Sequence, residues 1–140
     1  ENADAEIAAL NGLDVRNTAV VDERFKLQII SGISNEGASI NLTEYKPNYL
    51  KYSSNSTNDA IAIFSEIYYD KGWNAYVDGK SAPHFRANYV LRGMQVPAGQ
   101  HTIEFKFEPK TYKNGESISL ASSILLLLLL AFVSFKELKS

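Results

Sequence analysis

The sequence predicts a mainly β protein: a β-sandwich of about eight strands, immunoglobulin- or jelly-roll-like, with a short N-terminal helix and a C-terminal transmembrane helix. Three observations predict this fold. Apolar residues alternate with polar ones between residues 25 and 107, turn-forming residues separate these runs, and a long uncharged stretch lies near the C-terminus. We expect an N-terminal helix and lead-in over 1–24, the sandwich over 25–114, the transmembrane helix over 117–135 and a tail over 136–140.

The chain starts with an alanine-rich stretch, residues 3–12, which predicts a short helix ending at Gly12. After Gly12 the period of the apolar residues changes to two, the period of a strand with one buried face. The apolar residues of the expected strands are Phe25, Leu27 and Ile29; Ile40 and Leu42; Leu50 and Tyr52; Ile61, Ile63, Ile67 and Tyr69; Trp73, Ala75 and Val77; and Ile103, Phe105 and Phe107.

Two local signals add detail to these strands. Asp78-Gly79 predicts a tight hairpin with a type I′ turn, in which both central residues have positive φ. Around Gly93 the apolar phase changes from Tyr89 and Leu91 to Met94 and Val96, which predicts a β-bulge at that point. Strands at this spacing, with little helix between them, favour a sandwich over a βαβ fold.

The C-terminal stretch from Ile118 to Phe135 holds 18 residues without a charge, including six consecutive leucines. A helix of this length is about 27 Å long, enough to cross a hydrocarbon core of about 30 Å. A buried core helix is the alternative, but a helix that is apolar on every side needs a much larger domain to cover it. We therefore expect the membrane to be a partner, with lysines at both ends leaving the orientation open.

Composition excludes several classes of function. The 14 Lys and Arg balance 16 Asp and Glu, a formal net charge of −2, so we expect no nucleic-acid partner. Cysteine is absent, which excludes disulfides, thiolate metal sites and a cysteine nucleophile. Two histidines and no phosphate-binding glycine motif lead us to expect no metal site, no cofactor and no catalytic residue in this chain.

One segment, residues 68–89, combines aromatic rings with Asn, Asp and Arg. A ring can stack on the apolar face of a sugar while polar side chains bond its hydroxyls, so this composition is typical of a glycan-binding surface. The candidate glycan-binding residues are Trp73, Tyr76, Asp78, Arg86 and Asn88. The alternative, which the spacing favours, is that Trp73 belongs to the core, because it is in phase with Ala75 and Val77.

The order of several segments resembles one family. Gly72-Trp73-Asn74-Ala75-Tyr76-Val77-Asp78-Gly79-Lys80 is followed by Phe85-Arg86-Ala87-Asn88-Tyr89, by Val96-Pro97-Ala98-Gly99-Gln100-His101-Thr102-Ile103-Glu104-Phe105, and then by the membrane helix. Together with the upstream run from Asn11 to Asp22, this resembles the C-terminal end of the YfhO-like bacterial membrane proteins.

The resemblance implies a piece of a longer, polytopic protein of the bacterial inner (cytoplasmic) membrane. Such proteins are similar to glycosyltransferases that use lipid-linked sugars and are implicated in decorating cell-envelope polymers. Their catalytic carboxylates are expected in an N-terminal membrane part of the same parent chain. The resemblance also implies that residues 1–114 are extracytoplasmic and that the tail over 136–140 is cytoplasmic.

Two functions remain open. The sandwich is either a non-catalytic accessory module that contacts a cell-envelope glycan or polymer acceptor, or a purely structural domain that packs on the membrane part or on a partner. An exposed Trp73 with Tyr76 and Arg86 along a groove would favour the first, and a buried Trp73 the second. A free-standing tail-anchored enzyme is disfavoured, because no catalytic constellation is present.

Overall fold

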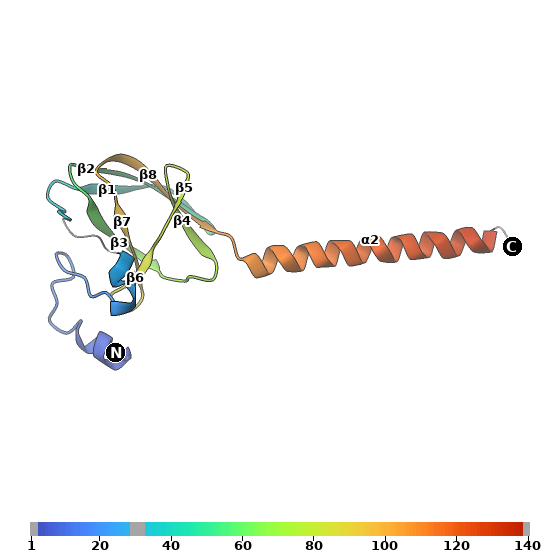
Figure 1. Cartoon of the computed structure of the whole chain (residues 1–140), viewed down its shortest axis with the longest axis horizontal. Helices are drawn as coiled ribbons and strands as arrows, with labels where there is room; N and C mark the ends of the chain where they lie inside the picture. The colour runs from blue at the N-terminus through green and yellow to red at the C-terminus, as the bar shows by residue number, and fades with distance from the viewer. Residues whose placement is uncertain (1–2, 29–32, 139–140) are drawn as a thin grey trace. The chain divides into compact units, whose positions relative to one another are not determined.

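A computed structural model describes residues 3–28 and 33–138, and the chain forms two units, Glu1–Phe107 and Glu108–Ser140 (Figure 1). We call the first unit the β domain; the second contains the long C-terminal helix. The helical elements are α1 (Ala3–Ala8), the short 3₁₀ helix η1 (Glu23–Gln28) and α2 (Lys110–Leu138). The strands are β1 (Ser39–Lys46), β2 (Tyr49–Ser56), β3 (Ala60–Ile67), β4 (Trp73–Val77), β5 (Lys80–Ala82), β6 (Phe85–Ala87), β7 (Leu91–Val96) and β8 (Gly99–Phe107).

The eight strands form two antiparallel sheets, which confirms the predicted mainly β fold with its short N-terminal helix and apolar C-terminal helix. One sheet has five strands in the order β1-β2-β8-β4-β5, and the other has three in the order β3-β7-β6. Because β8 runs between β2 and β4, its last residue, Phe107, lies beside Trp73, the first residue of β4. The strands begin at Ser39, later than the predicted start of the sandwich at residue 25.

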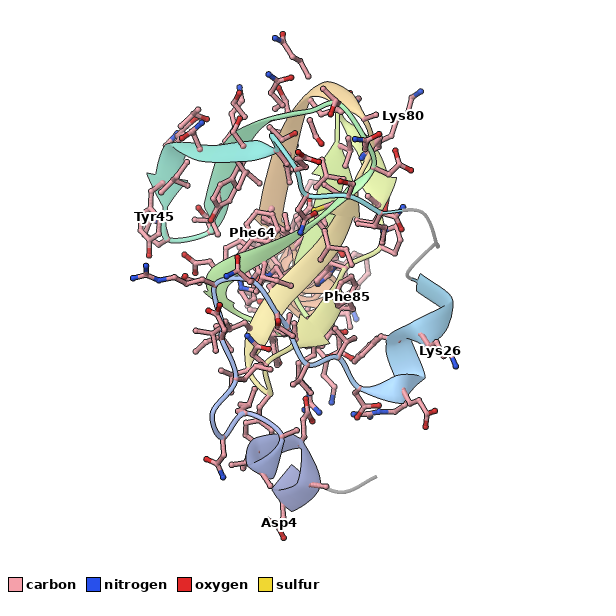
Figure 2. All side chains as sticks on the ribbon, turned by 90° about the vertical axis from the view of Figure 1, so that its left-hand side faces the viewer. Asp4, Lys26, Tyr45, Phe64, Lys80 and Phe85 are labelled. Carbon is pink, nitrogen blue, oxygen red and sulfur yellow. The ribbon has the colours of Figure 1, made fainter. Side chains whose placement is uncertain are left out.

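The core lies between the two sheets. Phe105 on β8 and Phe64 on β3 meet there edge to face, with ring centroids 4.9 Å apart. Figure 2 shows Phe64 and Phe85 in the interior of the β domain, whereas Tyr45 and Lys80 point outward. The buried core residues are Leu50, Ala75, Ile103 and Phe105 from the larger sheet and Phe64, Met94 and Val96 from the smaller one.

The N-terminal segment packs on the smaller sheet. Val21 forms a single β-bridge with Ala87 of β6, and the ring of Phe25 lies 6.5 Å from that of Phe85. The strand predicted over Phe25, Leu27 and Ile29 is wrong for Phe25 and Leu27, which lie in η1 instead. Ile29 lies outside the described residues. The reason is local: Asp22 accepts the backbone N–H of Arg24 on Oδ1 and that of Phe25 on its carbonyl oxygen, which turns the chain.

The pairing of β3 with β7 differs from the expectation at one point. Gly93 is regularly paired with Ile63, and the break in register lies in β3, between Phe64 and Ile67. The two additional residues of β3 at this point let Arg92, opposite Phe64, remain buried while Ile67 is 71% exposed. The predicted hairpin at Asp78-Gly79 is confirmed, with φ of 50° and 77° as a type I′ turn requires.

The helix α2 contains a segment, Gly115–Lys136, that is long and apolar enough to cross a membrane by length and composition. None of its most apolar stretch is buried against protein. The hydroxyls of Ser122 and Ser123 donate to the carbonyl oxygens of Ile118 and Ser119, so the polar groups of these serines are satisfied within the helix.

Candidate functional site: the Arg86 pocket

A cluster of polar side chains surrounds Arg86 on β6. Its Nη2 lies 2.6 Å from Glu6 Oε2 on α1 and 3.8 Å from Asp22 Oδ2. The bridge between Val21 and Ala87 positions Asp22, because it aligns the lead-in to η1 with the edge of β6. Three segments that are far apart in sequence therefore meet at one guanidinium.

Asn88 fixes the turn that follows β6. It has φ of 47°, a left-handed conformation that asparagine tolerates better than most residues. Its Oδ1 accepts the N–H of Val20 at 2.8 Å, and its own N–H donates to the Val20 carbonyl at 2.8 Å. Asn88 thus pairs with Val20 as a neighbouring strand would. The next residue, Tyr89, is also left-handed, at φ of 69°, which is uncommon for an aromatic residue.

A hollow of about 480 Å³ opens beside this turn, and we call it the Arg86 pocket. The guanidinium of Arg86 lies 5.5 Å from the ring centroid of Tyr89, and that of Arg24 lies 5.7 Å from the ring of Phe25. Each of these two guanidiniums therefore lies next to an aromatic ring at the opening of the pocket. Its walls are Arg24, Phe25, Ile67, Tyr68, Asp70, Arg86, Tyr89 and Val90.

The charges at this pocket are held in place by hydrogen bonds. Two bonds from Arg24 to the Asp22 carboxylate, at 3.0 Å each, lower the pKa of Asp22 to about 2. Burial raises the pKa of the Tyr68 hydroxyl, which stays protonated and available as a donor. Glu6 Oε1 and Arg86 Nε are buried without a hydrogen-bond partner among the described residues. These two atoms belong to the ion-paired side chains of Glu6 and Arg86 and are closed off from solvent.

The structure does not gather the five predicted residues into one groove. Trp73, Ala75 and Val77 face the core, and Trp73 is half-buried between the guanidinium of Arg92, at 4.7 Å, and the ring of Phe107, at 5.4 Å. Tyr76 lies on the opposite face of β4, where the ammonium of Lys106 is 4.8 Å from its ring centroid. Of the five, Arg86 and Asn88 come together, through the N-terminal segment.

Asp78 lies at the opposite end of β4 and forms a pair with His101. Nδ1 of His101 donates to Asp78 Oδ2 at 2.7 Å, and Nε2 donates to the Ala98 carbonyl at 2.9 Å. Both partners are acceptors, so these two bonds favour the doubly protonated ring, and the bond to Asp78 raises the pKa of His101. Ser81 lines a second hollow together with Asp78 and His101, but both ring nitrogens are already engaged, so neither is free to accept a proton from Ser81 in this arrangement. Nor do the described residues contain a group of three or more His, Asp or Glu side chains able to hold a metal ion.

Sequence reasoning missed most of the walls of the Arg86 pocket. Tyr68 and Tyr89 lie in the aromatic segment, and their interleaving with Asp70 and Arg86 was a signal for them. Arg24 and Phe25 had no such signal, because the predicted strand at Phe25 gave no reason for this segment to fold back onto β6.

Comparisons with known proteins agree with the resemblance. The family described as bacterial membrane protein YfhO matches residues 22–119. A curated relative, the uncharacterized protein YfhO of Bacillus subtilis (strain 168), is 27% identical over 112 residues, which cover 80% of this chain. The aligned region spans 13% of that relative's length. No solved structure matches the chain at a significant level.

Proposed function

The chain belongs to the YfhO family of bacterial membrane proteins, and we propose that its β domain is a non-catalytic, extracytoplasmic module of a larger polytopic protein. In this proposal the parent resembles glycosyltransferases that use lipid-linked sugars at the bacterial inner membrane. The helix α2 anchors the module, and the tail that begins at Lys136 is cytoplasmic. The aligned region is 13% of the relative's length, which supports the proposal that the β domain is one module of a much longer protein.

We propose further that the module contacts a cell-envelope glycan at the Arg86 pocket. The observation that carries this proposal is the combination of two guanidiniums with the rings of Phe25, Tyr68 and Tyr89 around one hollow. Sugars are bound by rings that stack on their apolar faces and by fixed polar groups that bond their hydroxyls. The hydroxyl of Tyr68 and the carboxylate of Asp70, both walls of the pocket, add a neutral donor and an acceptor for sugar hydroxyls.

The test is a titration of the full chain in detergent micelles with a GlcNAc–MurNAc disaccharide and with soluble teichoic-acid oligomers, followed by amide chemical shifts. We expect saturable shifts at Tyr68, Arg86 and Tyr89. Arg24→Gln should weaken binding about tenfold, because it removes a charge-assisted donor. Lys80→Gln is the matched control. Lys80 is exposed on β5, and its substitution also removes one positive charge, but at a site away from the pocket. Shifts that fail to saturate, or equal effects of both variants, would exclude the pocket.

The alternative function is purely structural: packing on the membrane part or on a partner, with no ligand. Two observations favour it. Trp73 packs against the core cluster, and Arg86 already has Glu6 and Asp22 as ionic partners. Under this alternative neither sugar shifts any resonance up to millimolar concentration, and Arg24→Gln changes stability alone.

A further inference from the structure

Exposed apolar side chains gather at the end of the β domain from which the chain continues into α2. We call this set the exit rim: Tyr45, Ile67, Tyr69, Val90 and Phe107, whose exposed fractions are 65%, 71%, 48%, 46% and 39%. Isolated apolar residues on a surface are ordinary, but a group at one end of a domain marks an interaction surface.

Strand register places the rim residues at that same end. Phe107, the last residue of β8, pairs with Trp73 and donates its N–H to the carbonyl of Asn48, in the turn that joins β1 to β2 just after Tyr45. Trp73 in turn donates its N–H to Tyr69. On the smaller sheet, Ile67 is the last residue of β3 to pair with β7, and Tyr68 donates to Val90. The rim thus comprises strand ends and turns from both sheets.

The chain path limits how far Phe107 can lie from the apolar span of α2. β8 ends at Phe107 and α2 begins at Lys110, so two residues, Glu108 and Pro109, connect them. The apolar span begins at Gly115. At about 3.5 Å for each extended residue and 1.5 Å for each helical one, the path from Phe107 to Gly115 is at most about 20 Å. The opposite end, where Asp78 and Lys80 lie, is one strand length farther from Phe107, so the chain path constrains it less.

We propose that the exit rim inserts into the headgroup region of the phospholipid bilayer, with Ile67 and Tyr69 as its main contacts. Tyrosine is favoured at this depth because its ring is apolar and its hydroxyl remains hydrated. The nearby charges support an apolar rather than an electrostatic attachment. Lys46 pairs with Glu44, Lys106 pairs with Glu104, and Lys71 follows Asp70 in the turn after Tyr69, so charges of both signs are interspersed near the rim.

The test uses single cysteines, which the natural sequence permits because it has none. The full chain with Ile67→Cys or Tyr69→Cys is labelled with the fluorophore NBD and reconstituted in phosphatidylcholine vesicles that carry a nitroxide on the lipid headgroup. The matched controls are Ile40→Cys and Leu42→Cys, which replace apolar residues that are 37% and 50% exposed in the half of β1 farther from Tyr45. Because all four side chains are exposed, the substitutions should preserve the fold, which circular dichroism verifies.

We expect the labels at 67 and 69 to be at least about twofold more quenched than those at 40 and 42, with no increase when phosphatidylglycerol is added. Equal quenching at the four positions would overturn the proposal. Blue-shifted fluorescence of the label at 67 without quenching by the lipid nitroxide would also overturn the proposal. That result would mean that protein covers the rim, either a second copy of the chain or another part of the parent. Quenching that requires phosphatidylglycerol and disappears at high salt would replace apolar insertion with adsorption by charge. Ile67 and Val90 also line the Arg86 pocket, so the rim and the pocket adjoin. None of these readouts involves a sugar, and the two proposals can therefore fail independently.

Discussion

The guanidinium carbon of Arg92 lies 4.4 Å from the ring centroid of Phe105, in the interior between the two sheets. Arg92 is 1% exposed, and the ring of Trp73 lies 4.7 Å from the same carbon. Its Nη2 donates to the carbonyl of Ile67 at 2.9 Å, while Nε and Nη1 have no hydrogen-bond partner among the described residues. The charge is thus held mainly by two aromatic faces, and its burial lowers the pKa of Arg92.

This arrangement predicts that shape matters more than charge at position 92. Arg92→Met fills similar space without a charge to desolvate, so we expect the β domain to stay folded, because apolar replacements of buried charges are often neutral or stabilising. Arg92→Ala should be about 2–5 kcal/mol less stable than Arg92→Met, because it leaves a cavity between the rings. Denaturant unfolding of the full chain in detergent, followed by far-ultraviolet circular dichroism, measures the difference. A methionine variant as unstable as the alanine variant would show that the guanidinium itself is required.

The two glycines that approach aromatic rings predict a second contrast. A Cβ at Gly93 would lie 2.5 Å from the ring of Phe85, which is 1% exposed and has nowhere to move. A Cβ at Gly72 would lie 2.3 Å from Phe107, which is 39% exposed and can rotate toward solvent. We expect Gly93→Ala to cost about 1–3 kcal/mol in unfolding free energy, and Gly72→Ala clearly less. Thermal unfolding of both variants compares them; a larger loss for Gly72→Ala would contradict this account.

The pair of Asp78 and His101 predicts a pH dependence. Their hydrogen bond raises the pKa of His101 above 6.5 and lowers that of Asp78 below 3.8. The histidine's contribution is complete below pH 6.5 and is lost as pH rises through its folded pKa. The aspartate's contribution is present above pH 3.8 and is lost as pH falls further. The pair therefore stabilises the domain most between these two values.

To measure this, the melting temperatures of the natural chain and His101→Gln are compared from pH 3 to pH 9. Their difference should be largest between pH 4 and 6 and should shrink above pH 7. His84, whose pKa burial lowers to about 4, titrates in both proteins and cancels in the difference. A difference that is constant with pH would mean that His101 contributes through packing rather than through its charge.

The strands and the core alternation could be predicted from the sequence because each depends on neighbours along the chain. Phe105 and Ile103 alternate with charged residues on β8, and both are buried as that pattern indicates. Ile67 could not be predicted, because its exposure follows from a register break in β3 that carries no glycine or proline as a signal. The buried Arg92 was equally hidden, since an arginine between Leu91 and Gly93 gives no indication that two rings from the other sheet enclose it.

The candidate site was predictable in part for a related reason. Arg86 and Asn88 belong to a segment whose aromatic and polar composition was conspicuous. Their partners Glu6, Val20 and Asp22 come from a lead-in about 70 residues away, and only the tertiary fold brings it there. Trp73 illustrates the opposite case: its phase with Ala75 and Val77 indicated a core position, and it packs there.

Asn88 provides the sharpest test of how the lead-in is attached, because its side chain and its backbone contribute separately. Asn88→Ala removes the oxygen that accepts the Val20 N–H. It also places alanine, which tolerates a left-handed conformation poorly, at a position with φ of 47°. Asn88→Gly removes the same acceptor but tolerates that φ. We expect the glycine variant to lose about 1–2 kcal/mol of unfolding free energy and the alanine variant about 1 kcal/mol more. In both variants, amide hydrogen exchange at Val20 should accelerate more than exchange within β8, because the lead-in detaches before the core opens. Unchanged protection at Val20 would show that the remaining contacts of the segment, such as the Val21–Ala87 bridge and the ion pairs of Arg86, hold it without the Asn88 side chain.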